Sequence, residues 1–444
     1  MTSTTSRADA APLFEKARLD SNHNNAPSNS SRRNQIARTV VIKVLEKLKS
    51  DSLVINEGGK VRTYGPGGGI EATLTINDER AWWHIASEGS IGFGRGYIEN
   101  WWDSPDPELV VRVAARNMGT LDELRNKVSK VTTPIGDRVR RLIPSPDREK
   151  NREDIGAHYD LGNDFFEIFL DETMTYSSAF FETPESTLAE ASLAKYDRLL
   201  HKLGVTSGTT VTEIGTGWGG LALRAAGTFG ADVVSTTISS EQFDEANVRV
   251  AAAAEKGEFN AAQVRLLKAD WRDMASASGR RSERLVSIEM IEAVDWRDYP
   301  EFFQALEANI TPDGLIGLQA ITVPDQRYER TKNTEDYIAR FVFPGGFLPS
   351  VGTIADVVSK HTGLRMLDVD DFGHHYAETL RRWRASFDSR LDEVRALDLD
   401  DRFIRLWRFY FAYCEAAFTE RHCSVNQIIL AGPQWRPEFP SVVE

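Results

Sequence analysis

The chain has 444 residues, of which 41% are hydrophobic and 27% are charged. This length is too great for one compact core, so the composition predicts a globular protein of two or more domains. The net charge of −13 disfavours nucleic acid as a partner, because backbone phosphates would be repelled. The two cysteines, Cys414 and Cys423, lack metal-ligand spacing and are typical of a reducing cytoplasm.

The first 133 residues predict a tail followed by a small α+β domain. Residues 1–35 are polar and rich in Ser, Asn and Arg, so we expect a disordered tail without a secretory signal. Residues 36–133 alternate between helical and strand-like patterns. In chain order these patterns predict a helix over Arg38–Leu53, a turn at Tyr64–Gly69, a strand over Glu71–Asn77, a strand and a turn over Trp82–Ile85 and Gly92–Gly96, and helices over Ile98–Asn117 and Leu121–Val131.

Residues 134–154 predict a linker, because prolines and charged residues are frequent there. Its basic residues are Arg138, Arg140, Arg141, Arg148, Lys150 and Arg152. Two interpretations stay open: a solvated connector, or a basic stripe on anionic lipid headgroups, where each cation contributes about 1 kcal/mol. The sequence has no run of apolar residues long enough to span a bilayer, so a lipid would have to be reached from the membrane surface.

Residues 155–444 have a different rhythm, in which short apolar strands alternate with amphipathic helices. Alternating units of this length predict a parallel, doubly wound sheet, which is an α/β fold. The predicted strands are Thr210–Ile214, Asp232–Thr237, Val264–Lys268, Arg284–Glu289 and Gly314–Thr322. The predicted helices are Leu188–Leu203, Leu221–Thr228, Gln242–Glu255, Tyr299–Ala308, Thr379–Arg395 and Asp400–Arg421.

A glycine-rich turn, Gly215–Gly220, follows the first of these strands and opens a helix. Gly215 and Gly217 let the backbone approach a ligand, although the same glycines also suit a tight structural turn. Their spacing matches a dinucleotide motif, but the acidic residue expected at the tip of the second strand is missing, since the chain there reads Ser235–Gln242. This weakens a dehydrogenase hypothesis, and the glycines alone do not choose the cofactor.

Longer motifs identify a family. They are His158–Phe166, Phe169–Ser178, Glu213–Gly220, Thr237–Gln242, Ser287–Val294, Phe343–Ser350 and Phe372–Tyr376. In this order they resemble the cyclopropane-fatty-acyl-phospholipid synthase family, which includes the mycolic acid cyclopropane synthases. Glu88–Gly94 and Trp101–Asp103 are similar to the N-terminal domain of phospholipid-acting bacterial members. The resemblance implies a Rossmann-like class I fold of S-adenosylmethionine (SAM)-dependent methyltransferases over residues 155–444, with helical lid insertions.

The resemblance also implies an activity, which is SAM-dependent methylation at the cis double bond of unsaturated fatty acyl chains in phospholipids. An alkene is a poor nucleophile, so it needs a strongly electrophilic methyl donor held in place. The positions matching cofactor-binding residues are Tyr176, Ser177, Gly215, Gly217, Thr237, Gln242 and Trp271. Core packing is the alternative for the two aromatic residues, and turn formation is the alternative for Ser177 and Thr237.

Methyl transfer leaves a carbocation on the acyl chain, and a proton must then be removed. Aromatic faces stabilise such a cation by roughly 0.5–2 kcal/mol each. The resemblance implies a bound bicarbonate ion as the base. The positions matching its ligands are Ser178, Glu292, Gln319, Ile321 and Tyr410. A helix-capping carboxylate is the alternative for Glu292, and a core tyrosine is the alternative for Tyr410.

Three positions depart from the family pattern. Ser178 stands where well-known cyclopropane synthases carry Cys, Gln319 where they carry His, and Ala293 where a His often follows the glutamate. An anion site of altered basicity is still expected, because Gln both donates and accepts hydrogen bonds. The set looks more like actinobacterial members that form a methylene branch, the precursor of 10-methyl fatty acids, which a separate flavin- or NADPH-dependent reductase completes. Two alternatives stay open: cyclopropane ring formation, and a non-catalytic protein that binds SAM and lipid.

Three further expectations concern the surroundings of the site. Residues Arg327–Ser350 predict either a mobile lid over the lipid entrance or a packed connection. The resemblance implies a cytoplasmic protein in peripheral contact with the inner face of the membrane. It also implies a homo-oligomer, expected to be a dimer.

Overall fold

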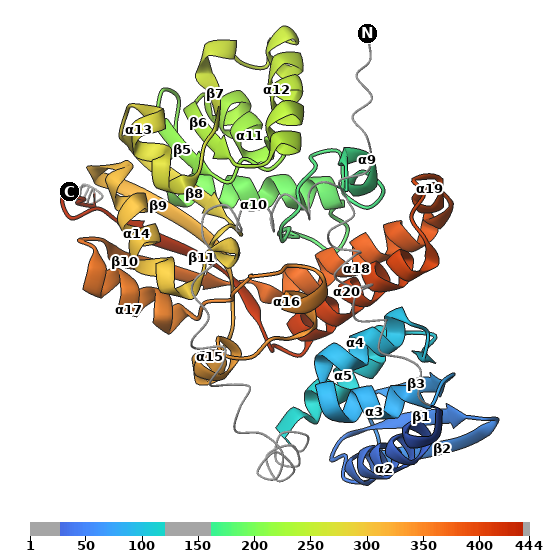
Figure 1. Ribbon diagram of the computed structural model, residues 1–444. Coiled ribbons are helices and arrows are strands. Elements are labelled where there is room, and N and C mark those ends of the chain that lie inside the picture. Colours follow the sequence, from blue (N-terminus) through green and yellow to red (C-terminus); the bar gives the residue numbers. More distant parts are fainter. Residues whose placement is uncertain (1–26, 120–160, 438–444) are drawn as a thin grey trace.

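The computed structural model describes residues 27–119 and 161–437, which form two sheets and the helices around them (Figure 1). The smaller sheet lies in the first of these segments, and a seven-stranded sheet lies in the second. The tail up to residue 26, the helix predicted over 121–131 and the predicted linker with its basic stripe lie outside the described residues.

The smaller sheet has the strand order β2-β1-β3-β4. β1 pairs antiparallel with β2 and parallel with β3, and the strand predicted over 71–77 is confirmed as β3. The strands are β1 Asp51–Glu57, β2 Lys60–Gly67, β3 Glu71–Ile76 and β4 Trp102–Asp103. The helices of this N-terminal domain are α2 Pro27–Leu45, α3 Arg80–Glu88, α4 Ser90–Ile98 and α5 Pro107–Arg116.

The predicted bounds of the tail and of the first helix are wrong. α2 begins at Pro27, so residues 27–35 are helical rather than disordered. This helix packs on α3, and the Arg33 guanidinium lies 4.6 Å from the centre of the Trp83 ring. Amino-acid composition does not predict such tertiary contacts. The helix also stops short of Leu53, because the residues around it pair with both neighbouring strands as β1.

The glycine cluster that predicts a turn lies inside α4, and the strand predicted just before it is α3. A Cβ atom on Gly94 would overlap the Tyr337 ring, and one on Gly96 would overlap the Trp102 ring. Glycine inside a helix costs about 0.5–1 kcal/mol relative to alanine. Here the missing side chains let α4 lie directly against large aromatic rings, so these glycines serve packing rather than a turn.

The larger sheet has the order β10-β11-β9-β8-β5-β6-β7. The predicted all-parallel sheet is a mixed one, because β11 runs antiparallel to both β9 and β10. The first residue of β11, Ser424, pairs with the last residue of β9, Thr322, so the two strands run in opposite directions. The strands are β5 Thr210–Ile214, β6 Asp232–Thr237, β7 Val264–Lys268, β8 Ser282–Ile288, β9 Ile310–Thr322, β10 Arg365–Asp371 and β11 Ser424–Ala431. The first three match their predicted bounds.

Helices cover both faces of this sheet (Figure 1). They are α9 Asn163–Phe166, α10 Leu188–Lys202, α11 Gly220–Phe229, α12 Ser240–Glu255, α13 Met274–Ser278, α14 Tyr299–Ala308, α15 Asp325–Thr331, α16 Tyr337–Phe341, α17 Val351–His361, α18 Gly373–Ser389, α19 Leu391–Ala396 and α20 Asp401–Thr419. The helix predicted over 379–395 is split at Arg390. No described helix has the length and apolar composition needed to cross a bilayer.

The segment Arg327–Ser350, predicted as a loop, contains α16 and most of α15. Tyr337 of α16 is fully buried, and its hydroxyl donates a hydrogen bond to the Leu406 carbonyl of α20 at 2.9 Å. The half of the segment that carries Tyr337 is therefore a packed connection rather than an open loop.

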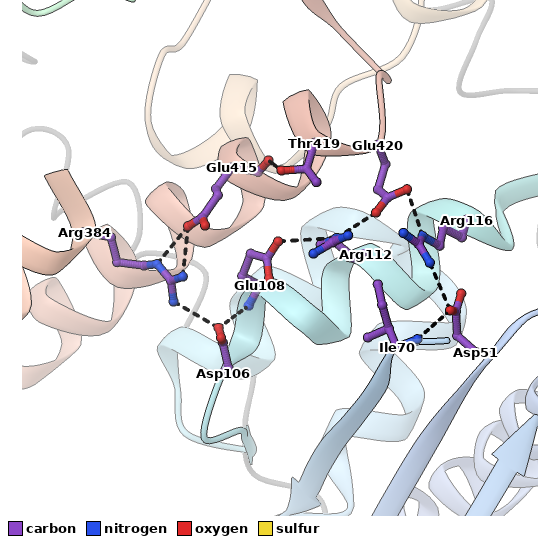
Figure 2. Close-up of polar contacts among 10 residues, drawn as sticks. All are labelled: Asp51, Ile70, Asp106, Glu108, Arg112, Arg116, Arg384, Glu415, Thr419 and Glu420. Carbon is purple, nitrogen blue, oxygen red and sulfur yellow. Dashed lines mark hydrogen bonds and ion pairs between the residues drawn. The ribbon is translucent and has the colours of Figure 1, made fainter. Parts of the chain in front are cut away.

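The N-terminal domain rests on α20 through α4 and α5. Figure 2 shows a chain of ion pairs along this interface. Arg384 of α18 bonds Glu415 of α20 at 2.9 Å and Asp106 at the start of α5 at 2.9 Å. Glu420 accepts from Arg112 at 2.6 Å and from Arg116 at 2.9 Å. Every carboxylate of this set therefore has an arginine partner.

Candidate active site

The turn after β5 contains three glycines with positive φ, 98° at Gly215, 52° at Gly217 and 87° at Gly219. The amides of Gly215 and Thr216 donate to the Thr236 carbonyl of β6 at 2.9 and 3.0 Å, which holds the turn against the next strand. A Cβ atom on Gly217 would meet no atom within 4 Å. The backbone is thus approachable from this side, as a nucleotide cofactor at the strand tips requires.

The predicted cofactor residues on β6 and α12 lie together. The Thr237 hydroxyl donates to the Gln242 side-chain oxygen at 3.0 Å, and Ser239 caps α12 between them. Trp271 begins the turn after β7, but its ring packs edge-on against Phe302 at 5.3 Å within the core. The structure therefore pairs Thr237 with Gln242 and places Trp271 nearby as a core aromatic.

Glu213 is a buried carboxylate that sequence reasoning did not single out. It precedes the turn at the end of β5 and accepts a 2.5 Å hydrogen bond from Ser235. Burial raises the pKa of Glu213 to about 8, against the effect of that hydrogen bond. Its position directly before the glycine-rich turn was the available signal.

The predicted residues Tyr176 and Ser177 have polar partners inside the fold. The Tyr176 and Tyr410 hydroxyls are 3.1 Å apart. Ser177 accepts a 2.5 Å hydrogen bond from the fully buried ammonium of Lys195 on α10. Burial lowers the pKa of Lys195 to about 8, opposed mainly by the attraction of Glu289. The sequence does not indicate that Lys195 is buried, because the segment around it has the pattern of an ordinary amphipathic helix, in which a lysine is expected on the exposed face.

Two predicted residues, Ser178 and Gln319, meet at Glu289, which was not predicted as a site residue. One Glu289 oxygen accepts from the Ser178 amide at 2.9 Å and from the Gln319 side-chain nitrogen at 2.8 Å. The other oxygen accepts from the Tyr376 hydroxyl at 2.9 Å. Burial raises the pKa of Glu289, while Lys195 and these three donors oppose the rise.

Glu292 and Ile321 also lie together, as predicted. The Ile321 amide donates to one Glu292 oxygen at 2.5 Å, and the other oxygen is enclosed without a hydrogen-bond partner among the described residues. Burial, and then the charge of Glu289, raise the pKa of Glu292 to about 8. An enclosed carboxylate oxygen without a partner is costly, so it marks a place where a proton or a ligand is handled.

Aromatic rings surround these polar groups. The Tyr176 ring lies 5.3 Å from both Phe166 and Trp383, and the Tyr410 ring lies 5.3 Å from Trp407. The arrangement suits chemistry on an apolar substrate, because it combines ring faces for a positive charge with carboxylates for a proton.

The donors expected for bicarbonate are already engaged within the chain. The Ser178 amide and the Gln319 side chain bond Glu289, the Ile321 amide bonds Glu292, and Tyr410 bonds Tyr176. Among these five residues, the only enclosed side-chain oxygen without a hydrogen-bond partner in the described residues is the second oxygen of Glu292. Most of these donors therefore bond the protein's own carboxylates rather than a free anion.

Comparisons with known proteins identify the family of the chain. The sequence model of a family described as mycolic acid cyclopropane synthetase matches residues 146–428. The tuberculostearic acid methyltransferase UfaA1 of Mycobacterium tuberculosis is 43% identical over 358 residues, which cover 79% of this chain and 81% of that protein. The cyclopropane-fatty-acyl-phospholipid synthase of Escherichia coli is 30% identical over 365 residues, which cover 82% of this chain and 89% of that protein.

Solved structures give the same answer for the fold. The mycolic acid cyclopropane synthase CmaA1, complexed with S-adenosylhomocysteine (SAH) and CTAB, matches with a TM-score of 0.58 and 31% identity, over 63% of this chain and 98% of that one. The cyclopropane synthase MmaA2 of Mycobacterium tuberculosis matches with a TM-score of 0.57 and 30% identity, again over 63% and 98%. The chain therefore belongs to the mycolic acid cyclopropane synthetase family and is a SAM-dependent methyltransferase with the class I fold.

Proposed function

We propose that this methyltransferase adds the methyl carbon of SAM to the cis double bond of unsaturated acyl chains in phospholipids and releases a methylene-branched acyl chain. The observation that carries the proposal is the pair Glu289 and Glu292, set among aromatic rings beside the strand tips. The 43% identity to a tuberculostearic acid methyltransferase supports the branched product. The product would be the precursor of a 10-methyl fatty acid.

Different groups of residues would bind the cofactor, stabilise the cation and accept the proton. Bound SAM would supply an electrophilic methyl group, held by Gly215, Gly217, the Thr237–Gln242 pair and the Tyr176–Ser177 segment. The faces of Tyr176, Trp383 and their neighbours would stabilise positive charge on the acyl chain by roughly 0.5–2 kcal/mol each without reacting with it. The enclosed carboxylates would accept the proton that leaves, and the apolar walls would exclude water.

The N-terminal domain supports a phospholipid substrate. Only 16 residues lie beyond residue 428, so alignments that cover 79% and 82% of the chain must reach into this domain. The mycolic acid cyclopropane synthase structures align over only 63% of the chain yet over 98% of their own length. At least part of this domain therefore aligns with the relative named for phospholipids, which supports the proposed substrate. We further propose peripheral contact with the inner face of the membrane, a homodimer, and a flavin- or NADPH-dependent reductase that acts on the product.

The second candidate product is a cyclopropane ring, which the 30% identity to a cyclopropane synthase favours. Ring closure and methylene formation share the first cation, and both remove a proton from the new methyl group. They differ in whether a hydride shift moves the cation to the methyl-bearing carbon before that proton leaves. Gln319 replaces a residue of the well-known ring-forming members, and its side chain bonds Glu289, whereas Ser178 bonds Glu289 through its backbone amide. The altered surroundings of the base favour the methylene product.

One experiment tests the activity and separates the products. The protein is incubated with vesicles of dioleoyl phospholipid and methyl-labelled SAM, and the fatty acids are analysed by mass spectrometry before and after mild hydrogenation. We expect a labelled acyl chain that takes up hydrogen, as a methylene branch does and a ring does not. Vesicles of a fully saturated phospholipid are the control. Label that survives hydrogenation without a mass gain would establish the ring, and no label in lipid would refute the activity.

A further inference from the structure

We propose that the Glu289 carboxylate is itself the base that removes the proton from the methylated acyl chain, so that turnover needs no exchangeable bicarbonate ion. This inference rests on the proposed function, since it assigns a residue to its last chemical step. The family resemblance implied a bound bicarbonate at this place, and the inference replaces that ion with a side chain of the protein.

Glu289 lies near the glycine turn of the proposed cofactor site. Glu289 follows β8, whose neighbour β5 leads into the glycine turn, and a Cβ atom on Gly215 would lie 3.4 Å from the Met290 side chain. Glu289, Met290 and Glu292 each keep part of their accessible surface, although the strands before them are buried. These three residues are therefore less deeply buried than the strand before them and lie beside the cofactor turn, although the second Glu292 oxygen itself is enclosed.

Three hydrogen-bond donors surround the Glu289 carboxylate. They come from three separate parts of the fold: the Ser178 amide before α10, the Gln319 side chain on β9, and the Tyr376 hydroxyl on α18. Amide and hydroxyl donors converging on one point are what an anion site requires. The anion that they hold is part of the chain.

The backbone at Glu289 has a positive φ of 49°. This left-handed conformation favours glycine and costs a residue with a side chain about 1 kcal/mol. Glycine would be the relaxed choice for such a turn if only its shape mattered. A strained glutamate that places its carboxylate on three converging donors points to a role for the carboxylate itself.

Glu289 and Glu292 differ in how readily their carboxyl groups ionise. Two carboxylates that share one site do not both ionise readily, and the burial that raises the pKa of Glu292 to about 8 leaves it protonated at neutral pH. Glu289 is the better stabilised as an anion, because it accepts three hydrogen bonds and is attracted by Lys195. An added bicarbonate would bring a further negative charge without free donors.

The step balances without any other reactant. The methyl group moves from sulfur to one alkene carbon and leaves a cation on the chain, which a hydride shift carries to the methyl-bearing carbon. A C–H bond of the new methyl group breaks, its electron pair forms the methylene double bond, and the proton passes to a Glu289 oxygen. The proton returns to solvent after the product leaves, and the demethylated cofactor is the other product.

The inference is tested with the full-length enzyme, dioleoyl phospholipid vesicles and buffers freed of carbon dioxide. We expect wild-type turnover to be the same with and without added bicarbonate. Glu289→Gln should lower turnover by about 10²–10³-fold, the range that a general base contributes, with the SAM dissociation constant nearly unchanged. Glu289→Gly suits the local backbone, and bicarbonate or formate should restore part of its turnover by filling the vacated place.

The controls separate this role from a structural one. Glu108→Gln changes a carboxylate at the domain interface and should leave turnover and its insensitivity to bicarbonate unchanged. Wild-type turnover that collapses without bicarbonate, or Glu289→Gly that turns over normally without any added anion, would overturn the inference. Wild type that methylates no lipid under any condition would instead refute the proposed function, so the two failures are distinguishable.

Discussion

Two groups of enclosed glutamates in this protein have opposite surroundings. At the domain interface, Glu415 and Glu420 are bonded by arginines (Figure 2). Near the strand tips, Glu289 and Glu292 accept from amides and hydroxyls, and neither forms an ion pair within residues 27–119 and 161–437. Paired charges are typical of a structural contact, whereas an unpaired carboxylate beside a ligand turn keeps its capacity to take a proton.

The largest expected effect is on the unpaired side of this comparison. Glu292→Gln should reduce turnover by about 10²-fold or more, because it removes the enclosed acidic proton beside the proposed base Glu289. The SAM dissociation constant should stay nearly the same, since Glu292 bonds β9 and not the cofactor turn. Steady-state rates with labelled SAM and equilibrium binding measure the two quantities. Wild-type turnover in this variant would remove Glu292 from the mechanism.

On the paired side, Arg384→Met should lower the free energy of unfolding by about 3 kcal/mol, because Glu415 and Asp106 lose their common partner. Urea unfolding measures this loss. The matched control is Arg395→Met, whose partners Asp392 and Asp401 are exposed, and its effect should stay within about 0.5 kcal/mol. Equal effects of the two substitutions would contradict the structural role given to the interface.

Gly217→Val tests the approachable side of the glycine turn. The positive φ makes a β-branched residue unfavourable by about 1–2 kcal/mol. The added side chain would point into the space left beside the backbone, so SAM affinity should fall by at least about tenfold, as a loss of 1.4 kcal/mol does. Titration of SAM into both proteins tests this. A variant that binds SAM as tightly as wild type would place the cofactor elsewhere.

The smallest expected effect is a contrast in pH dependence. Hydrogen bonds from Arg116 and Arg112 outweigh burial and lower the pKa of Glu420 below 4.5, so its stabilisation is present above that pH and is lost as the pH falls further. Native Glu292 binds a proton between pH 4.5 and about 8 that the unfolded chain has released, so its contribution is lost as the pH rises through that window.

Melting temperatures measured from pH 3 to 9 report both contributions. Glu420→Gln should flatten the acid side of the profile, and Glu292→Gln should flatten the alkaline side. If Glu292→Gln left the alkaline side unchanged, the raised pKa of this carboxyl would be wrong.

Much of the fold could be predicted from local sequence patterns. The strands β5, β6 and β7 have their predicted bounds, because short runs that contain Val, Leu, Ile and Thr and lie between turn residues are typical of strands. β10 and β11 were missed, since β10 is largely polar and exposed and β11 follows a long helix without a turn signal. The sequence predicts a strand and a turn where α3 and α4 lie, because aromatic and glycine residues are typical of strands and turns as well as of close helix packing.

The sequence by itself determined the family, the cofactor class and the position of the glycine turn, because these depend on motifs in short continuous segments. Only the tertiary structure decided that the Ser178 amide, Gln319 and Tyr376 converge on Glu289, and that Lys195 lies against Ser177. These groups come from segments up to about 200 residues apart, since a hydrogen bond depends on distance in space and not on spacing along the chain.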